Sequence, residues 1–177
     1  ANPIGIELMK LVDTLTRSGY QLDIVSPEWL SKAYVGHGML TLNGCHYNSV
    51  LLPYCNVIPA SAWEVIRRAS DADFTVIADL PSSPVIDPTG ESLPPPERYE
   101  AFNLQEGAAK RIMHLIPPTF VLPPGSIGTV RRKGDRFEVH VIADRRGGKF
   151  SGSFTYLGET IEIPERTERF IDLLPTD

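Results

Sequence analysis

The pattern of apolar and polar positions predicts alternating helices and strands over the first 80 residues. Apolar residues at helical spacing follow Asn2-Pro3 and stop at Gly19, which predicts a first helix. A short second helix is expected after Ser26-Pro27, and a third runs from a capping box at Ser61–Glu64 to about residue 70. Short apolar runs predict strands over 21–25, 39–42, 45–47, 49–53 and 74–78.

The predicted strands 39–42 and 45–47 are joined by Asn43-Gly44. Asparagine followed by glycine accepts the positive φ angles of a tight two-residue turn, so the two strands are expected to form a hairpin. The runs at 49–53 and 74–78 are apolar throughout, as in strands that are buried on both faces.

Helices that alternate with strands over short links are typical of an α/β fold. The predicted fold class is therefore α/β, a doubly wound and mostly parallel sheet, followed by a small antiparallel β unit. Such domains normally begin with a strand, whereas this chain begins with a helix. Together with the short β region, this predicts a piece of a larger protein, with an exposed sheet edge that self-association would cover.

The chain changes character after the strand at 74–78. Residues 81–96 hold six prolines and predict a long surface excursion, which is followed by a helix over 104–115. Residues 1–125 carry 8 basic and 13 acidic side chains, and residues 126–177 carry 9 of each. We expect an α/β domain over 1–125 and an antiparallel β-sandwich-like segment over 126–177, with strands near 127–132, 137–143 and 150–156.

Composition excludes several classes of function. A net charge of −5 gives no basic footprint for nucleic-acid binding, and no apolar run of about 18 residues predicts a membrane span. No metal-ligand or phosphate-loop spacing occurs, so neither a metal nor a cofactor is expected. The basic residues near 131–133 and 145–146 are interpreted as a solvated face, and the two cysteines leave the redox compartment open.

Candidate chemistry lies where predicted parallel strands end, because α/β sheets bind ligands at the carboxyl ends of their strands. Tyr54, Cys55 and Asn56 follow one strand, and Asp79 follows the next. Asp79 either faces a ligand or caps the backbone amides of the loop that follows it.

Cys55 invites a cysteine-nucleophile hypothesis, with His37, His46 or His114 as base. No sharp strand-to-helix turn surrounds it to lower the pKa of its thiol, so a packed thiol is the favoured interpretation.

Several short motifs resemble the glutamine-amidotransferase-like, flavodoxin-like domain of large bacterial glycoside hydrolases. The resemblance is to family 106 α-L-rhamnosidases and to the trimerisation domains of family 42 β-galactosidases. It rests on residues 19–26, 44–47, 50–53 and 76–79, and on 131–135 and 139–145 in the tail.

The resemblance implies a non-catalytic accessory module of a carbohydrate-processing enzyme, whose catalytic residues lie in a barrel domain that is absent from this sequence. It implies no catalytic residue here, because Asp79 stands where an active amidotransferase leads into its nucleophile. Tyr54, Asn56 and Asp79 are the candidate substrate-binding residues. The implied partners are that barrel, a carbohydrate and further copies of the chain. The alternatives are an active cysteine-dependent amidotransferase or hydrolase, centred on Cys55 with His46 or His114, and a small-molecule-binding flavodoxin-like domain.

Overall fold

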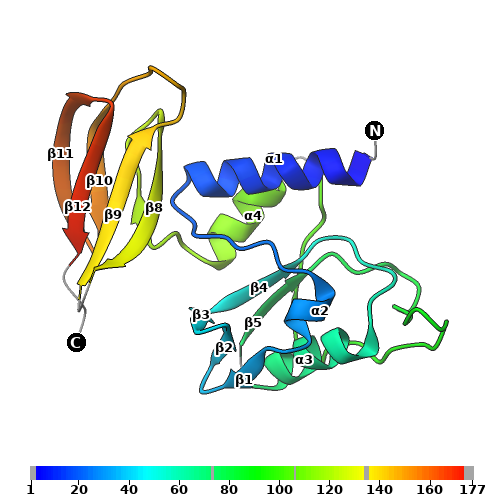
Figure 1. Ribbon diagram of the computed structural model, residues 1–177. Helices are drawn as coiled ribbons and strands as arrows, with labels where there is room; N and C mark the ends of the chain where they lie inside the picture. Colours follow the sequence, from blue (N-terminus) through cyan, green and yellow to red (C-terminus); the bar gives the residue numbers. More distant parts are fainter. Residues whose placement is uncertain (1–2, 73, 106, 134–135, 174–177) are drawn as a thin grey trace. The chain divides into compact units, whose positions relative to one another are not determined.

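The computed structural model describes residues 3–72, 74–105, 107–133 and 136–173 (Figure 1). The chain divides into two compact units. The first comprises Ala1–Leu8 and Ile24–Ile112, and the second comprises Met9–Asp23 and Met113–Asp177. Each unit is therefore built from two segments that are separated in the sequence. No described helix is long and apolar enough to cross a membrane.

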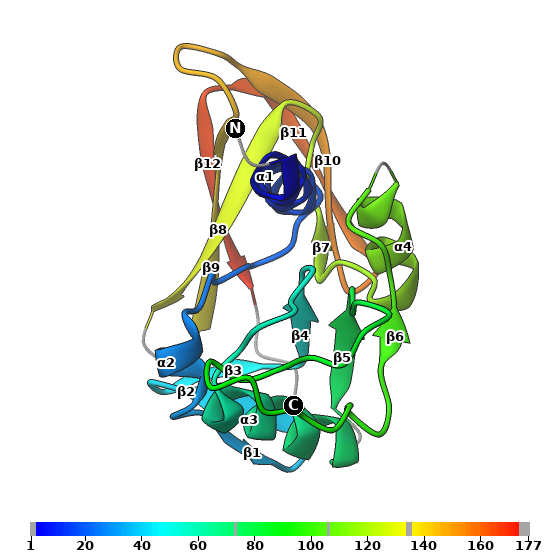
Figure 2. The same cartoon turned by 90° about the vertical axis from the view of Figure 1, so that its right-hand side faces the viewer.

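The prediction of a doubly wound α/β fold of the flavodoxin-like class is wrong. The described residues form mostly antiparallel strands and four short helices, which are α1 (Pro3–Arg17), α2 (Pro27–Leu30), α3 (Ala60–Asp71) and α4 (Ala108–Leu115). One three-stranded sheet is parallel, in the order β4 (Ser49–Leu52), β5 (Thr75–Ala78) and β6 (Glu100–Ala101). Figure 2 shows these three strands side by side.

Two local features account for the error in fold class. The segment 21–25 forms no strand, so nothing extends the parallel sheet from the N-terminal side. The strands next in line form a separate antiparallel sheet, in the order β1 (Tyr34–Gly36), β2 (Met39–Leu42) and β3 (Cys45–Tyr47). The predicted hairpin is confirmed, with φ angles of 51° at Asn43 and 78° at Gly44.

Helix α3 holds the first unit together because it packs against both β1 and β5. Its buried face contributes Trp63, Val65 and Ile66 to the core. The predicted capping box at its start is wrong, since the N-cap residue is Pro59 and no side chain caps the helix. The helix is therefore stabilised by burial of its apolar face rather than by its first turn.

The proline-rich stretch is tied to α3 and to itself by polar contacts. Trp63 Nε1 donates a 2.6 Å hydrogen bond to the Pro94 carbonyl, and Ser70 Oγ donates to the Arg98 carbonyl at 2.7 Å. Asp87 Oδ1 accepts hydrogen bonds from the Thr89 hydroxyl and backbone, and from the Glu91 backbone. The Thr89 hydroxyl is the main cause that lowers the pKa of Asp87.

The second unit has two three-stranded antiparallel sheets around one apolar core. The sheet orders are β11-β10-β7 and β12-β9-β8. The strands are β7 (Phe120–Val121), β8 (Ser126–Lys133), β9 (Arg136–Ala143), β10 (Phe150–Tyr156), β11 (Glu159–Arg166) and β12 (Glu168–Leu173). The predicted strands within 126–156 are confirmed, and β11 and β12 extend the antiparallel pattern to Leu173.

Residues 9–23 are held in the second unit by a series of side-chain contacts. Arg17 forms an ion pair with Asp144, and the Tyr20 hydroxyl donates to the Ile116 carbonyl. Gln21 Nε2 donates to the Gly128 carbonyl, and its Oε1 accepts from the Val130 amide, both at 3.1 Å. The strand predicted at 21–25 therefore does not form. The side-chain amide of Gln21 hydrogen-bonds to the backbone of β8 instead.

Gly19 permits this attachment. Its φ angle is 93°, and a Cβ atom built at this position would lie 2.0 Å from the Phe120 carbonyl oxygen. Gly147 has a comparable φ of 72°, but nothing lies within 4 Å of a Cβ atom there. An alanine at either position would have a strained positive φ, but only an alanine at position 19 would also clash with neighbouring atoms.

We predict that Gly19→Ala lowers the free energy of unfolding by about 3 kcal/mol, because it adds a clash with backbone to the strain of a positive φ. Gly147→Ala, the matched control, carries the strain alone and should cost about 1 kcal/mol. Urea unfolding followed by circular dichroism measures both. Equal losses in the two variants would contradict the close approach of Gly19 to Phe120.

Candidate functional site

The carboxyl ends of β4 and β5 lie next to each other in the first unit. The two strands pair in parallel with Leu52 opposite Ala78, and the Asp79 backbone N–H donates to the Leu52 carbonyl at 2.9 Å. Tyr54 and Asn56 follow β4 within four residues of Leu52. The structure therefore places the loop of Tyr54 and Asn56 and the residue Asp79 at the same edge of the parallel sheet.

The Asp79 carboxylate holds the segment before α4. Its Oδ2 atom accepts a 2.8 Å hydrogen bond from the Leu104 backbone N–H, and the side chain is partly buried. This is the capping role that the sequence left open, although the amide that is capped lies 25 residues further along the chain. Oδ1 accepts no hydrogen bond from the residues that the structure describes.

Tyr54 and Asn56 present side chains to solvent. Tyr54 is 43% exposed, and neither its hydroxyl nor the Asn56 amide has a partner among the described residues. The backbone beneath them is fixed: the Asn56 carbonyl accepts from Ile86 N–H, and the Ile86 carbonyl accepts from Ile58 N–H, both at 3.0 Å. This short parallel bridge between Val57 and Ile86 anchors the loop to the proline-rich stretch.

Cys55 lies between these two residues and has the environment of a packed thiol. It is half buried against the core of the first unit, and its Sγ donates a long 3.6 Å hydrogen bond to the Val57 carbonyl. Burial raises the pKa of the thiol, and the Val57 backbone offsets this only in part. His46 Nδ1 lies 3.0 Å from Thr41 Oγ1, and no described histidine forms a hydrogen bond with Cys55.

A second cluster of charged and aromatic side chains lies on the outer face of the β12-β9-β8 sheet. Arg131 and Lys133, which the sequence placed on a solvated basic face, both pair with the buried Glu138. Burial alone would raise the pKa of Glu138, but its hydrogen bonds to the two cations outweigh burial and lower it. His140 stacks on Phe170 with centroids 4.2 Å apart. The two cations and Glu138 therefore pair their charges within the sheet, while His140 and Phe170 pack against each other.

No three described His, Cys, Asp or Glu side chains are grouped as ligands for a metal ion. The sequence reasoning missed Leu104 as the partner of Asp79. It also gave no weight to the exposed face of β1, β2 and β3, whose outward residues become adjacent only through the antiparallel register. Neither contact could be predicted from the spacing of neighbouring residues in the sequence.

Comparison with known protein families finds no match, and no curated protein matches the sequence. A solved structure that is similar to this chain is an apo exo-carrageenase of glycoside hydrolase family 42 from Bacteroides ovatus. The identity is 12% and the TM-score is 0.46, over 93% of this chain and 24% of that one. The chain spans about a quarter of the length of that enzyme.

We predict that Asp79→Ala lowers the free energy of unfolding by roughly 1–2 kcal/mol, because the Leu104 amide loses a charged acceptor. Asp79→Asn keeps an oxygen acceptor and should lose less than half as much. Urea unfolding of the two variants beside the parent chain makes the comparison. An alanine variant as stable as the parent would show that the bond to Leu104 contributes nothing.

Thiol labelling should separate the two cysteines. Cys45 is exposed, whereas Cys55 is half buried with a raised pKa, so iodoacetamide should alkylate Cys55 several-fold more slowly near pH 8. Because burial raises the pKa of the Cys55 thiol, its alkylation rate should still be rising at alkaline pH. The variants Cys45→Ser and Cys55→Ser isolate each thiol for mass spectrometry. Faster alkylation of Cys55 at pH 6 would indicate an activated nucleophile.

Proposed function

We propose that this chain is a non-catalytic accessory module of a carbohydrate-processing glycoside hydrolase, and that Tyr54, Asn56 and Asp79 border a sugar. The observation that carries the proposal is the edge where β4 and β5 end side by side. The segments that follow the two strands carry three groups without described partners: the Tyr54 ring and hydroxyl, the Asn56 amide and Asp79 Oδ1.

These groups match the chemistry of a sugar. An aromatic ring packs against the C–H face of a pyranose, and amide and carboxylate groups exchange hydrogen bonds with its hydroxyls. The Ile86 backbone holds the loop at Asn56, and the Leu104 N–H holds the Asp79 carboxylate, so these two residues are positioned before a ligand arrives.

The same edge argues for binding rather than catalysis. Cys55 is the one thiol there among the described residues, and burial raises its pKa. One carboxylate oxygen of Asp79 already accepts a hydrogen bond from the Leu104 N–H, as expected of a residue with a structural role. In this proposal the bond-breaking carboxylates belong to a barrel domain of the same enzyme. That barrel and a second copy of this chain are the proposed protein partners.

The proposal is tested by saturation-transfer difference NMR with methyl β-galactoside and methyl α-rhamnoside. We expect sugar C–H signals that weaken several-fold in Tyr54→Ala, because the aromatic surface is lost. Tyr99→Ala is the matched control, since Tyr99 is similarly exposed but lies directly before β6 and not after β4 or β5. Asn56→Ala should weaken the signals less than Tyr54→Ala.

A glutaminase assay on the same preparations tests whether the chain is instead catalytic. Glutamine hydrolysis that disappears in Cys55→Ala would overturn the non-catalytic role and favour a cysteine-dependent amidotransferase. Sugar signals that persist unchanged in Tyr54→Ala and Asn56→Ala would overturn the assignment of the site.

A further inference from the structure

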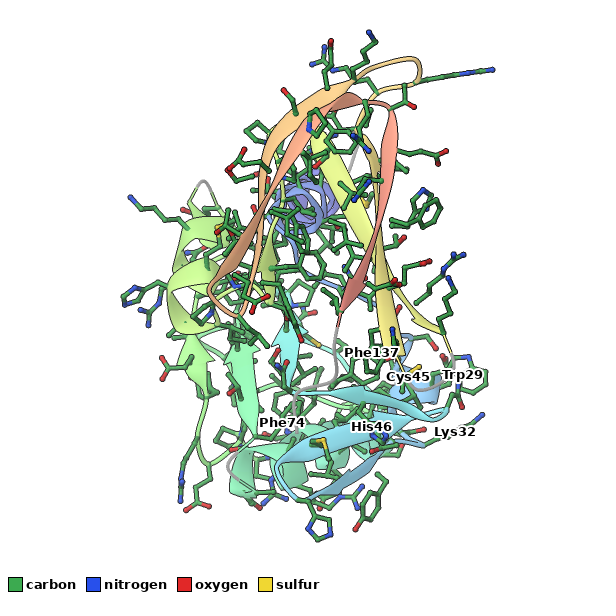
Figure 3. The ribbon with its side chains drawn as sticks, turned by 90° about the vertical axis from the view of Figure 1, so that its left-hand side faces the viewer. Trp29, Lys32, Cys45, His46, Phe74 and Phe137 are labelled. Atoms are coloured by element: carbon green, nitrogen blue, oxygen red, sulfur yellow. The ribbon has the colours of Figure 1, made fainter. Side chains whose placement is uncertain are left out.

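The outward face of the β1-β2-β3 sheet carries a row of three side chains, one from each strand. The register pairs Tyr34 with Thr41 and Thr41 with His46, so all three point to the same side. The opposite side carries Leu40 and Leu42, which are buried in the core. Figure 3 shows His46 on this sheet.

Tyr34 lies flat on the sheet because its own strand has a glycine two residues further on. A Cβ atom at Gly36 would lie 2.6 Å from the Tyr34 Oη and 2.7 Å from its Cε1, so the ring occupies the space above Gly36. The residue is nevertheless 62% exposed. One side of the ring therefore rests on the backbone and the other faces solvent.

Polar groups flank this ring. Thr41 Oγ1 and His46 Nδ1 are 3.0 Å apart, which fixes the imidazole beside the strand. His46 Nε2 and the Tyr34 hydroxyl have no partner among the described residues. The face thus combines a supported aromatic surface with groups that donate and accept hydrogen bonds.

The three strands of this sheet also carry no Asp, Glu, Lys or Arg. From Ala33 to Trp63 the sequence contains no Asp, Glu, Lys or Arg, although charged residues make up 22% of the chain. Strands without charged residues offer no ion pair to an ionic ligand, and no strand charge has to lose its hydration when a neutral ligand displaces water. Trp29, another exposed aromatic residue of this unit, differs in this respect, because Lys32 Nζ lies 4.4 Å from its ring (Figure 3).

We infer that the outward face of Tyr34, Thr41 and His46 binds a neutral pyranose ring of a sugar chain. The C–H face of the sugar stacks on Tyr34, and its hydroxyls bond to His46 Nε2 and the Tyr34 hydroxyl. This inference rests on the proposed role in carbohydrate processing and adds a second surface, distinct in sequence and in sheet from Tyr54, Asn56 and Asp79.

The test is ¹H–¹⁵N NMR titration of the chain with cellotetraose and with β-1,4-galactotetraose, and with tetragalacturonate as an anionic contrast. We expect amide shifts at residues 34–36, 41 and 46 with one of the neutral sugars and none with the anionic one. Tyr34→Ala should weaken this binding roughly tenfold, and Tyr34→Phe should retain most of it, because stacking needs the ring.

Gly36→Ala tests the geometry itself. Gly36 does not have a positive φ, so an added methyl group displaces only the flexible end of Tyr34. The variant should fold normally and still lose several-fold in affinity, whereas the surface control Tyr99→Ala should lose none.

Three results would overturn the inference: no shifts with either neutral sugar at residues 34–46, tighter binding of the anionic sugar, or full affinity in Tyr34→Ala. Shifts at residues 54, 56 and 79 without shifts at 34, 41 and 46 would retain the proposed function while rejecting this second surface. Shifts at residues 34, 41 and 46 alone would support the second surface and reject the assignment of Tyr54, Asn56 and Asp79.

Discussion

The parallel pairing of β4 with β5 is the contact on which the first unit depends. It sets Leu52 opposite Ala78, and the hydrogen bond from Asp79 N–H to the Leu52 carbonyl continues the ladder by one step. Because β4 and β5 end together, the residues after each strand emerge at one edge. The Asp79 side chain then reaches Leu104, so the same edge also holds the chain as it approaches α4. A slip of one residue in this register would move Leu52 away from Ala78 and would separate the residues that follow the two strands.

The elements whose formation depends on residues adjacent in the sequence could be predicted from the sequence. Asn43-Gly44 closes its hairpin because only such residues accept two consecutive positive φ angles at low cost. The fully apolar strands at β4 and β5 and the helix at α3 also followed from the pattern of apolar positions. In each case the residues that form the element are neighbours in the sequence, so their pattern contains the necessary information.

The fold class could not be predicted in the same way, because it depends on which strands pair across long stretches of chain. Residues 21–25 alternate polar and apolar side chains as a strand does, but the Gln21 side chain bonds to the backbone of β8, more than 100 residues away in sequence. The close approach of Gly19 to Phe120 is equally remote. The candidate site shows the same division: the strand ends were predictable, whereas the Leu104 partner of Asp79 and the row of Tyr34, Thr41 and His46 required the register.

Charge is distributed differently in the two units, and this difference bears on what each can do. In the second unit the buried carboxylate of Glu138 is paired with Arg131 and Lys133 within the sheet. In the first unit the uncharged stretch from Ala33 to Trp63 supplies both the loop after β4 and the outward face of β1, β2 and β3. A surface that offers aromatic and hydrogen-bonding groups without charge discriminates by shape and hydroxyl pattern rather than by electrostatic attraction. That selectivity suits neutral sugars, for which the positions of hydroxyl groups are the main distinguishing feature.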